Sequence, residues 1–131
     1  MSKEIILNFV RGINEHNINA LAELMSENHN FIDAHGNMVE GRETMKSGWA
    51  GYFSLFPDYK IEITDMYEYG NTFVMFGNAS GTFKGINPET NSWKLPATFR
   101  AELQNDKVKL WQVYCDTKIP FDIIQRNSQK P

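Results

Sequence analysis

The spacing of hydrophobic residues changes at Pro57 from the period of a helix to that of a strand, and this change limits the classes of fold that the chain can adopt. Over residues 45–56 large hydrophobic side chains recur at intervals of four, four and three, which is the period of an α-helix. Over residues 59–64 they alternate with polar side chains, which is the period of a half-buried β-strand. Helices followed by strands predict an α+β fold.

Three helices are predicted in the first part of the chain. The first carries an apolar stripe over residues 5–13. The second is a short helix at 21–25, with Asn17 or Asn19 as its N-cap. The third spans 41–56 and ends there because the proline that follows cannot continue a helix.

Long strands are predicted in the second part of the chain. Gly77 and Gly81 lie inside one of them, and glycines within a strand often mark bulges or sharp bends. Residues 70–71 and 105–106 have the composition of tight hairpin turns. A strongly bent antiparallel sheet packed on helices forms a cone, with a cavity between the two layers. The predicted strands cover residues 59–64, 73–83, 93–104 and 108–116.

Length and composition predict one folded domain. A chain of 131 residues is within the usual size of a single domain and can bury a core without metal or disulfide. Aromatic residues make up 13% of the chain, which favours a core or a cavity walled with rings. We expect the domain to cover residues 1–117 and a polar tail over 118–131 to fray.

Charge and residue usage exclude several classes of function. The net charge is −3 and no run of basic residues occurs, so we expect no nucleic-acid partner. No apolar run is long enough for a membrane span and no signal-peptide pattern is present, so we expect a cytoplasmic protein without a membrane partner. The lone Cys115 cannot form an intrachain disulfide and fits a reducing compartment.

We also expect no metal and no cofactor. The chain has no phosphate-binding glycine loop and no histidine spacing typical of a zinc site. His16 and His29 are expected in solvent at helix ends.

One short stretch carries the best candidates for chemistry. Residues 31–36 read Phe-Ile-Asp-Ala-His-Gly, which predicts a short strand entering a turn. Side chains two apart on a strand point to the same face, so Asp33 and His35 would share a face with Phe31. A carboxylate and an imidazole that face a pocket form an acid/base couple, whereas the same pair facing water has no catalytic meaning.

Several segments together resemble the SnoaL-like branch of the nuclear-transport-factor-2-like superfamily, which is related to steroid isomerases, polyketide cyclases and limonene epoxide hydrolase. The order and spacing of these segments carry the resemblance, which covers nearly the whole chain from Ile5 to about Pro120. It implies a cystatin-like cone, with three N-terminal helices on a strongly curved, mostly antiparallel sheet that encloses a pocket. The segments are Asn-Ile-Asn-Ala-Leu at 17–21, Asp-Ala-His-Gly at 33–36 before Gly-Arg-Glu at 41–43, Gly-Thr-Phe-Lys-Gly at 81–85, and Asp-Lys-Val at 106–108 before Trp111 and Tyr-Cys-Asp at 114–116.

The resemblance implies that Asp33 occupies the position of the isomerase general base and points into the cone. An aspartate among aromatic rings should have a raised pKa, because burial disfavours the charged form. His35 would then be its partner or proton donor. The alternative is that Asp33 accepts backbone hydrogen bonds in the turn at 36–37 and that His35 is a locally bonded turn residue.

The chain lacks the side chains that stabilise the oxyanion in the steroid isomerases it resembles. The isomerase oxyanion hole uses a tyrosine and a protonated aspartate, and these positions fall on Phe9 and Ala97 here. Neither side chain can donate a hydrogen bond, so steroid isomerisation by that mechanism is not expected. The second carboxylate of the epoxide hydrolase falls on Val113.

Two functions therefore remain open. The first is a lyase, isomerase or cyclase acting on a small apolar or cyclic carbonyl compound, with Asp33 as base. The second is a non-catalytic ligand-binding or dimerisation module. We expect a homodimer formed through the outer sheet face, with Gln112 and Tyr114 at its two-fold interface. In either case the expected pocket wall is aromatic and apolar: Phe9, Trp49, Tyr52, Phe53, Phe56, Phe99, Trp111, Val113 and Cys115.

Overall fold

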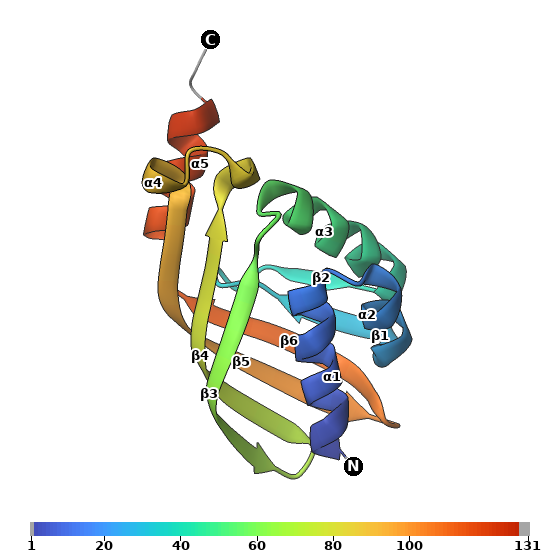
Figure 1. Cartoon of the computed structure of the whole chain (residues 1–131). Helices are drawn as coiled ribbons and strands as arrows, with labels where there is room; N and C mark the ends of the chain where they lie inside the picture. The colour runs from blue at the N-terminus through green and yellow to red at the C-terminus, as the bar shows by residue number, and fades with distance from the viewer. Residues whose placement is uncertain (1, 129–131) are drawn as a thin grey trace.

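A computed structural model describes residues 2–128 as five α-helices, a short 3-10 turn and one six-stranded sheet (Figure 1). The architecture confirms the predicted α+β cone class. In chain order the elements are α1 (Ser2–Glu15), α2 (Ile18–Leu24), β1 (Met25–Ile32), β2 (Met38–Glu40), α3 (Arg42–Leu55), β3 (Lys60–Tyr69), β4 (Thr72–Thr82), η1 (Phe83–Gly85), α4 (Pro88–Asn91), β5 (Ser92–Gln104), β6 (Lys107–Cys115) and α5 (Lys118–Ser128).

The three N-terminal helices form where the apolar spacing predicts them. On α1 the residues at helical spacing, Ile6, Phe9 and Ile13, are fully buried against the sheet. Asn17 caps α2, because its side-chain oxygen accepts a hydrogen bond from the backbone N–H of Ala20 at 3.0 Å. This confirms one of the two N-caps that the sequence left open.

The sheet has the strand order β2-β1-β6-β5-β4-β3. Neighbouring strands are antiparallel except β1 and β6, which run parallel. The two predicted tight turns join β3 to β4 and β5 to β6. Figure 1 shows the long strands β4 and β5 bending along their length, with α1 across one face of the sheet and α3 beside the upper ends of the strands.

The course of β1 differs from the prediction. The strand begins at Met25 rather than Phe31, because residues 26–30 are polar and hide the strand period, while pairing with β6 holds them extended. It ends at Ile32, so Asp33 and His35 lie beyond it in a turn. The prediction that these two side chains share a strand face with Phe31 is therefore wrong.

Gly77 marks the predicted bend in β4. A Cβ atom at this position would lie 1.7 Å from the backbone oxygen of Glu62, which no side chain tolerates. The register between β3 and β4 shifts at the same place, between Ile63 and Asp65. Only glycine lets the two backbones approach so closely, and the sheet bends there.

The segment after β6 is not a frayed tail. Residues 118–128 form α5, and Ile123 on this helix is only 4% exposed within the core. The buried Asn91 holds the far end of α5, because its side-chain oxygen accepts hydrogen bonds from Arg126 and Asn127. Figure 1 shows α5 beside α4 at the end of the molecule opposite the N-terminus. The remainder of the predicted tail, 129–131, lies outside the described residues.

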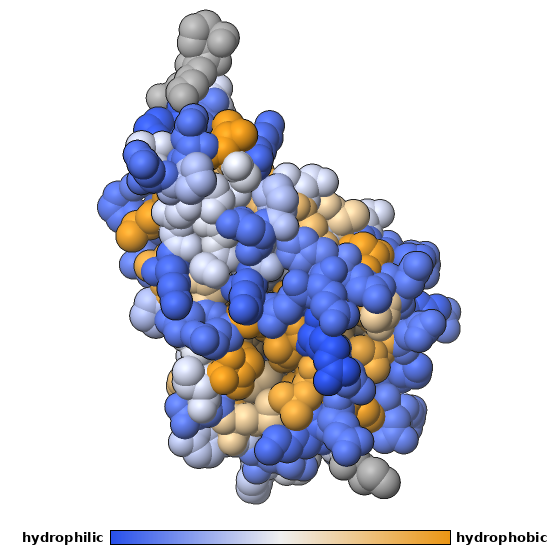
Figure 2. All heavy atoms as spheres, viewed as in Figure 1, coloured by the Kyte–Doolittle hydropathy of each residue, from blue (hydrophilic) through white to orange (hydrophobic). Residues whose placement is uncertain are grey.

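The surface of the described residues is mostly hydrophilic on the face that carries α1. Figure 2 shows hydrophobic side chains gathered on this face between α1 and β3. Within residues 2–128 no helix is both long and apolar enough to cross a membrane.

Candidate functional site

Both carboxylate oxygens of Asp33 accept hydrogen bonds within the turn that follows β1. One oxygen, Oδ1, accepts hydrogen bonds from the backbone N–H groups of His35 and Asn37, both at 2.9 Å. The other oxygen, Oδ2, accepts from the side-chain amide of Asn37 at 3.2 Å. Backbone bonds from Asp33 to Asn37 and from Gly36 to Asp33 close the turn. The carboxylate therefore acts as a turn residue, which is the simpler of the two predicted roles.

These contacts set the acidity of Asp33. Burial by itself would raise the pKa of this carboxyl group, but the hydrogen bonds from Asn37 and His35 outweigh it and hold the pKa below its ordinary value. The predicted raised pKa of Asp33 is therefore wrong. A carboxylate with a lowered pKa is a weak proton acceptor near neutral pH, so the turn does not prepare Asp33 for general base catalysis.

His35 contacts the end of the chain rather than the carboxylate. Its Nε2 atom is hydrogen-bonded to the hydroxyl of Thr117 at 2.8 Å, and its ring stacks on Phe121 with a centroid distance of 5.2 Å. Only the backbone of His35 binds Asp33. The two predicted catalytic residues thus lie close together but serve different contacts, one within the turn and one to α5.

Part of the predicted pocket wall forms the packed floor of the cone. Phe9, Phe99 and Trp111 are at most 1% exposed, and their rings pack on one another with centroid distances of 5.0 and 5.5 Å. Phe53 and Phe56 are also buried in the same core. These rings cover one another's faces, so the residues belong to the packed core.

Other members of the predicted wall remain accessible. Tyr52 on α3 and Val113 and Cys115 on β6 are only half-buried, although the residues next to them along the inner face, Phe99 and Trp111, are buried completely. These three side chains pack against the core and keep part of their surface exposed. We call these three half-buried residues the inner rim.

Four aromatic side chains connect the inner rim to the interior. Trp49 lies 6.5 Å from Tyr52, Tyr52 lies 4.8 Å from Tyr59, and Tyr59 lies 6.2 Å from Trp93, all between ring centroids. We call this series, Trp49-Tyr52-Tyr59-Trp93, the ring chain. Its two terminal members have buried indole N–H groups for which residues 2–128 supply no hydrogen-bond partner.

Tyr59 and Trp93 were not among the predicted site residues. Both belong to stretches with alternating hydrophobic residues, so the same period that predicts the strands also places them on an inner face. The sequence could not predict that Tyr59 would contact Tyr52 on α3 across the cone.

The phenol groups of the ring chain and the thiol next to it are uncharged near neutral pH. Burial, with no hydrogen bond to offset it, raises the pKa of both Tyr59 and Tyr52, and the neighbouring Cys115 adds to the shift in the same direction. Burial likewise raises the pKa of the Cys115 thiol, with a further contribution from Asp116. These three groups therefore stay protonated near neutral pH.

His29 is a second buried polar group that the prediction placed in solvent. It is fully buried on β1, and its Nδ1–H donates a hydrogen bond to the carbonyl oxygen of Val108 at 2.7 Å. Its other nitrogen, Nε2, has no partner among the described residues. Burial lowers the pKa of His29, the bond to Val108 opposes that change, and Lys109 reinforces it. The imidazole fills the position where the register between β1 and β6 is irregular.

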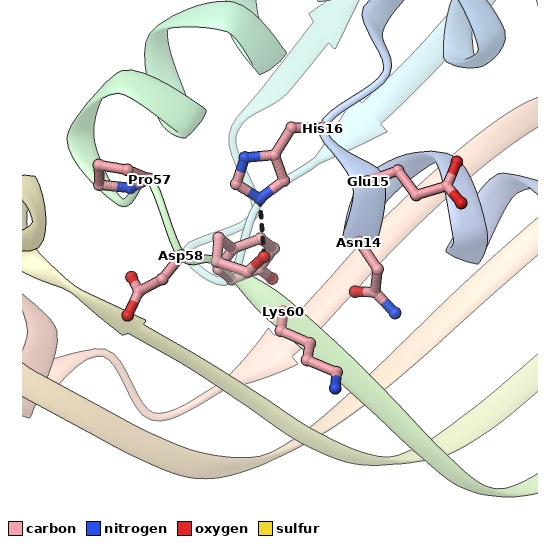
Figure 3. A pocket seen from close by; sticks show the side chains of 7 residues that line it. Asn14, Glu15, His16, Pro57, Asp58 and Lys60 are labelled. Atoms are coloured by element: carbon pink, nitrogen blue, oxygen red, sulfur yellow. Dashed lines mark hydrogen bonds between the residues drawn. The ribbon is translucent and has the colours of Figure 1, made fainter.

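Two hollows lie on the surface rather than in the cone. The first, of about 300 Å³, lies where the end of α1 meets the start of β3 (Figure 3). There His16 Nε2 donates to the carbonyl oxygen of Tyr59 at 2.8 Å, and the Asn14 side chain bonds both backbone groups of Ile61. Asp58 accepts two hydrogen bonds from Thr82. These polar side chains hold the edge strand β3, which is a structural role.

The second hollow, of about 330 Å³, lies on the surface of α1 and α2, next to Arg11 and Glu23. Among residues 2–128 no group of three or more His, Cys, Asp or Glu side chains is placed to hold a metal ion.

Comparison with known proteins identifies the fold. The sequence profile of the SnoaL-like domain matches residues 6–111. None of the curated protein sequences matches the chain.

Solved structures with the same architecture are numerous, and three are representative. A ketosteroid isomerase-like protein from Catenulispora acidiphila, in complex with trimethylamine, has a TM-score of 0.80 at 20% identity, over 91% of this chain and 90% of its own. A protein named as a SnoaL-like polyketide cyclase from Shewanella denitrificans has a TM-score of 0.81 at 14% identity, over 95% and 97%. An epoxide hydrolase from M. tuberculosis has a TM-score of 0.78 at 10% identity, over 95% and 90%. The TM-scores establish a shared fold, whereas identities this low do not show a shared reaction.

Proposed function

This chain belongs to the SnoaL-like domain family, and we propose that it binds a small, mostly apolar molecule at the inner rim without using Asp33 as a general base. One observation carries the proposal. The inner rim is half-buried and combines the aromatic ring of Tyr52 with the apolar side chains of Val113 and Cys115, whereas both carboxylate oxygens of Asp33 accept hydrogen bonds within a turn. Apolar surfaces with a few placed polar groups are typical of small-molecule sites.

The comparisons support a small-molecule site of this kind. The Catenulispora protein was crystallised with trimethylamine, and other proteins of this fold are named as a cyclase and an epoxide hydrolase. A lyase, isomerase or cyclase activity in this chain would need a base and an oxyanion donor. Asp33 has a lowered pKa, while Phe9 and Ala97 offer no side-chain donor.

The thiol of Cys115 offers a direct probe of the inner rim, because it is the one cysteine of the chain. Naphthalene serves as the test ligand, and iodoacetamide alkylation of Cys115 is followed by mass spectrometry with and without it. We expect naphthalene to slow alkylation by roughly threefold or more at saturation and to raise the melting temperature, as any ligand of the native state does. Unchanged alkylation at saturating naphthalene would overturn the proposal.

A matched pair of substitutions locates the site. Val113→Asn places an amide on the inner rim, whereas Val74→Asn makes the same change at another half-buried valine, on β4, between the inward residues Phe73 and Met75. We expect only Val113→Asn to weaken naphthalene binding. Equal effects of the two variants would contradict binding at the rim.

Catalysis by Asp33 is tested separately. A panel of small cyclic ketones is incubated with the native protein and with Asp33→Asn, and each compound is recovered and identified. We expect recovery of unaltered compounds from both proteins. A compound that the native protein converts and Asp33→Asn does not would establish Asp33 as a catalytic base.

The predicted homodimer is compatible with this site. Tyr114 on β6 is about half exposed and alternates with the rim residues Val113 and Cys115, so a partner on the outer face would leave the rim free. Light scattering of the native protein and of Tyr114→Lys checks the assembly, and we expect the variant to favour the monomer.

A further inference from the structure

One long edge of the sheet is open over half of its length. β3 is the last strand in the sheet order, so β4 pairs with it along one side only. The other side is closed at its start, where Asn14 bonds both backbone groups of Ile61 and His16 donates to the carbonyl oxygen of the residue that precedes the strand. No other residue among 2–128 bonds the backbone of β3 on this side. The second half of the strand is therefore a free sheet edge, which is a template for pairing with another strand.

The register between β3 and β4 shows where this edge is regular. The shift between Ile63 and Asp65 is a bulge, and from Asp65 to Tyr69 every residue has a partner on β4 in unbroken register. Backbone groups of an antiparallel strand point alternately to its two sides, so about half of the N–H and C=O groups of 65–69 point away from β4. We call residues 65–69 the open edge.

An apolar surface borders β3 on the side of α1. Leu7, Val10 and Asn14 lie on one side of this helix at spacings of three and four, and the bonds from Asn14 to Ile61 turn that side towards β3. Figure 1 shows the start of α1 at the same end of the molecule as the turn between β3 and β4, so Leu7 and Val10 lie further along β3 than Ile61 does. Leu7 is 40% exposed, and hydrophobic side chains gather between these two elements in Figure 2.

Two tyrosines project from the outer face of the open edge. Tyr67 is 62% exposed, and its ring meets that of Phe76 edge-on at a centroid distance of 6.0 Å. Tyr69 is 89% exposed and is two residues further along the strand, so it points to the same face. A strand added at this edge lies between these rings on one face and the Leu7 side of α1 on the other. Sites that bind by strand addition combine main-chain hydrogen bonds with flanking surfaces of this kind.

The charges of β3 decide which strand fits. Glu62, Asp65 and Glu68 are exposed, and none of the three forms an ion pair with residues 2–128. The cations on these two elements lie at their starts, Lys60 beside the closed part of β3 and Lys3 in the first turn of α1. A second copy paired antiparallel would bring the carboxylates of two open edges towards one another, which is destabilising, whereas a basic segment neutralises them.

We propose that the open edge binds an extended, basic peptide segment of another protein, which joins the sheet as a further strand beside β3. The backbone of the segment bonds the outward N–H and C=O groups of 65–69, and its basic side chains on the outer face meet Asp65 and Tyr67. Arginine suits this face better than lysine, because a planar guanidinium binds a carboxylate through two hydrogen bonds and stacks on a tyrosine ring. This site is separate from the inner rim and does not depend on it.

A series of end-protected hexapeptides tests the charge preference. Arg-Val-Arg-Val-Arg-Val and its lysine and glutamate analogues are each titrated into uniformly ¹⁵N-labelled full-length protein at neutral pH and low salt. We expect the arginine peptide to bind most tightly, the lysine peptide more weakly and the glutamate peptide not at all. Raising the salt to about 150 mM should weaken binding of the arginine peptide severalfold, because exposed charges are screened.

Backbone methylation tests strand addition itself. Methyl groups on the amide nitrogens of all the arginines, or of all the valines, block one edge of the extended peptide or the other. Arginine on the outer face fixes which peptide edge faces β3, so we expect one methylated isomer to bind like the parent peptide and the other to lose binding. The parent peptide should also slow hydrogen exchange of backbone amides within 65–69.

A charge reversal with a matched control locates the site. Glu68→Lys on the open edge should weaken binding of the arginine peptide by roughly fivefold, the effect of about one exposed ion pair. Glu89→Lys makes the same change at an exposed glutamate on α4 and should leave binding unchanged. The two variants have the same net charge, so a difference between them reports the position of the site.

Several results would overturn the proposal. Equal binding of the arginine and glutamate peptides would show that the carboxylates of β3 do not select the partner. Binding of both methylated isomers as tightly as the parent would exclude strand addition, and amide signals of 65–69 that stay in place would exclude this edge. If the native protein alone protects these amides more strongly at higher protein concentration, a second copy occupies the edge and the basic partner is wrong.

Discussion

The turn at 33–37 and the ring chain both carry polar side-chain groups, and they differ in whether those groups have hydrogen-bond partners. In the turn, Asp33 accepts three hydrogen bonds from its own segment. In the ring chain, the buried N–H groups of Trp49 and Trp93 have no partner among residues 2–128. A polar group that is fully bonded within the fold contributes to stability and has little left to offer a ligand. Unpaired groups are the better guide to binding.

The largest expected effect concerns the bend that brings β5, and with it Trp93, over the helices. Gly77→Ala would place a Cβ atom 1.7 Å from the oxygen of Glu62, so the two strands must separate there. We expect the free energy of unfolding in urea to fall by about 3 kcal/mol, at the upper end of what overpacking costs.

A glycine on α3 supplies the control for that prediction. A Cβ atom at Gly51 meets nothing within 4 Å, so Gly51→Ala should raise the free energy of unfolding by up to about 1 kcal/mol through helix propensity. A Gly77→Ala protein as stable as the native one would show that the bend does not depend on this glycine.

The next effect concerns His29, a buried group with one ring nitrogen bonded to Val108 and the other without a partner among residues 2–128. Because burial lowers its pKa in the folded protein, the unfolded chain binds a proton first as the pH falls. Stability should therefore be complete above about pH 6.5 and decline below it, by up to about 1.4 kcal/mol per pH unit, until the folded protein also binds the proton.

His29→Gln should remove this acid-dependent loss, since the amide can still donate to Val108 and does not titrate. Urea unfolding from pH 8 to pH 5 provides the measurement. His16→Gln, the same substitution at a half-buried histidine, is measured alongside it as the matched variant. The same slope in native and His29→Gln proteins would remove His29 as its source.

A smaller effect is expected in the turn. Asp33→Ala removes the acceptor of two backbone N–H groups, and we expect it to lower the free energy of unfolding at pH 7 by about 1 kcal/mol. The hydrogen bonds hold the pKa of Asp33 below its ordinary value, so this contribution is present above about pH 4 and is lost as the carboxylate is protonated at lower pH.

The measurement is the difference between native and Asp33→Ala proteins at pH 7 and at pH 3, with the exposed Glu40→Ala as control. Binding of naphthalene should be the same in native and Asp33→Ala proteins. A difference in stability that persists unchanged at pH 3 would argue against the ionised carboxylate as its cause.

The smallest effect is expected for a hydroxyl in the ring chain. Tyr59→Phe removes an oxygen whose environment contributes burial but no hydrogen bond, so stability should change by no more than about 0.5 kcal/mol. Thr82→Val removes a hydroxyl that donates to Asp58 at 2.7 Å, and should cost about 1–2 kcal/mol. A larger loss of stability in Tyr59→Phe than in Thr82→Val would show that the Tyr59 hydroxyl is hydrogen-bonded in the native protein.

Much of the fold was predictable because it depends on local patterns. The helical spacing of residues 45–56 produced α3, the asparagine before α2 became its cap, and Gly77 marks the expected bend. Each of these features depends on residues that are close together in the sequence. The start of β1 and the helix α5 were missed, since polar residues 26–30 become a strand by pairing with β6, and α5 is held by Asn91 from another element.

The candidate site depended far more on contacts between distant segments. The sequence alone predicted an α+β cone and singled out Asp33, His35 and a set of aromatic residues as candidates, since composition, period and turn residues are local properties. The folded chain determined which of those polar groups are already paired. The Asp33 carboxylate is bonded to residues two and four positions later, while the rings that contact Trp93 belong to Tyr59 and Phe56, more than thirty residues earlier. Burial and hydrogen-bond pairing are properties of the assembled core, so no local pattern could predict that Asp33 is paired and that the indole N–H groups of Trp49 and Trp93 have no partner among residues 2–128.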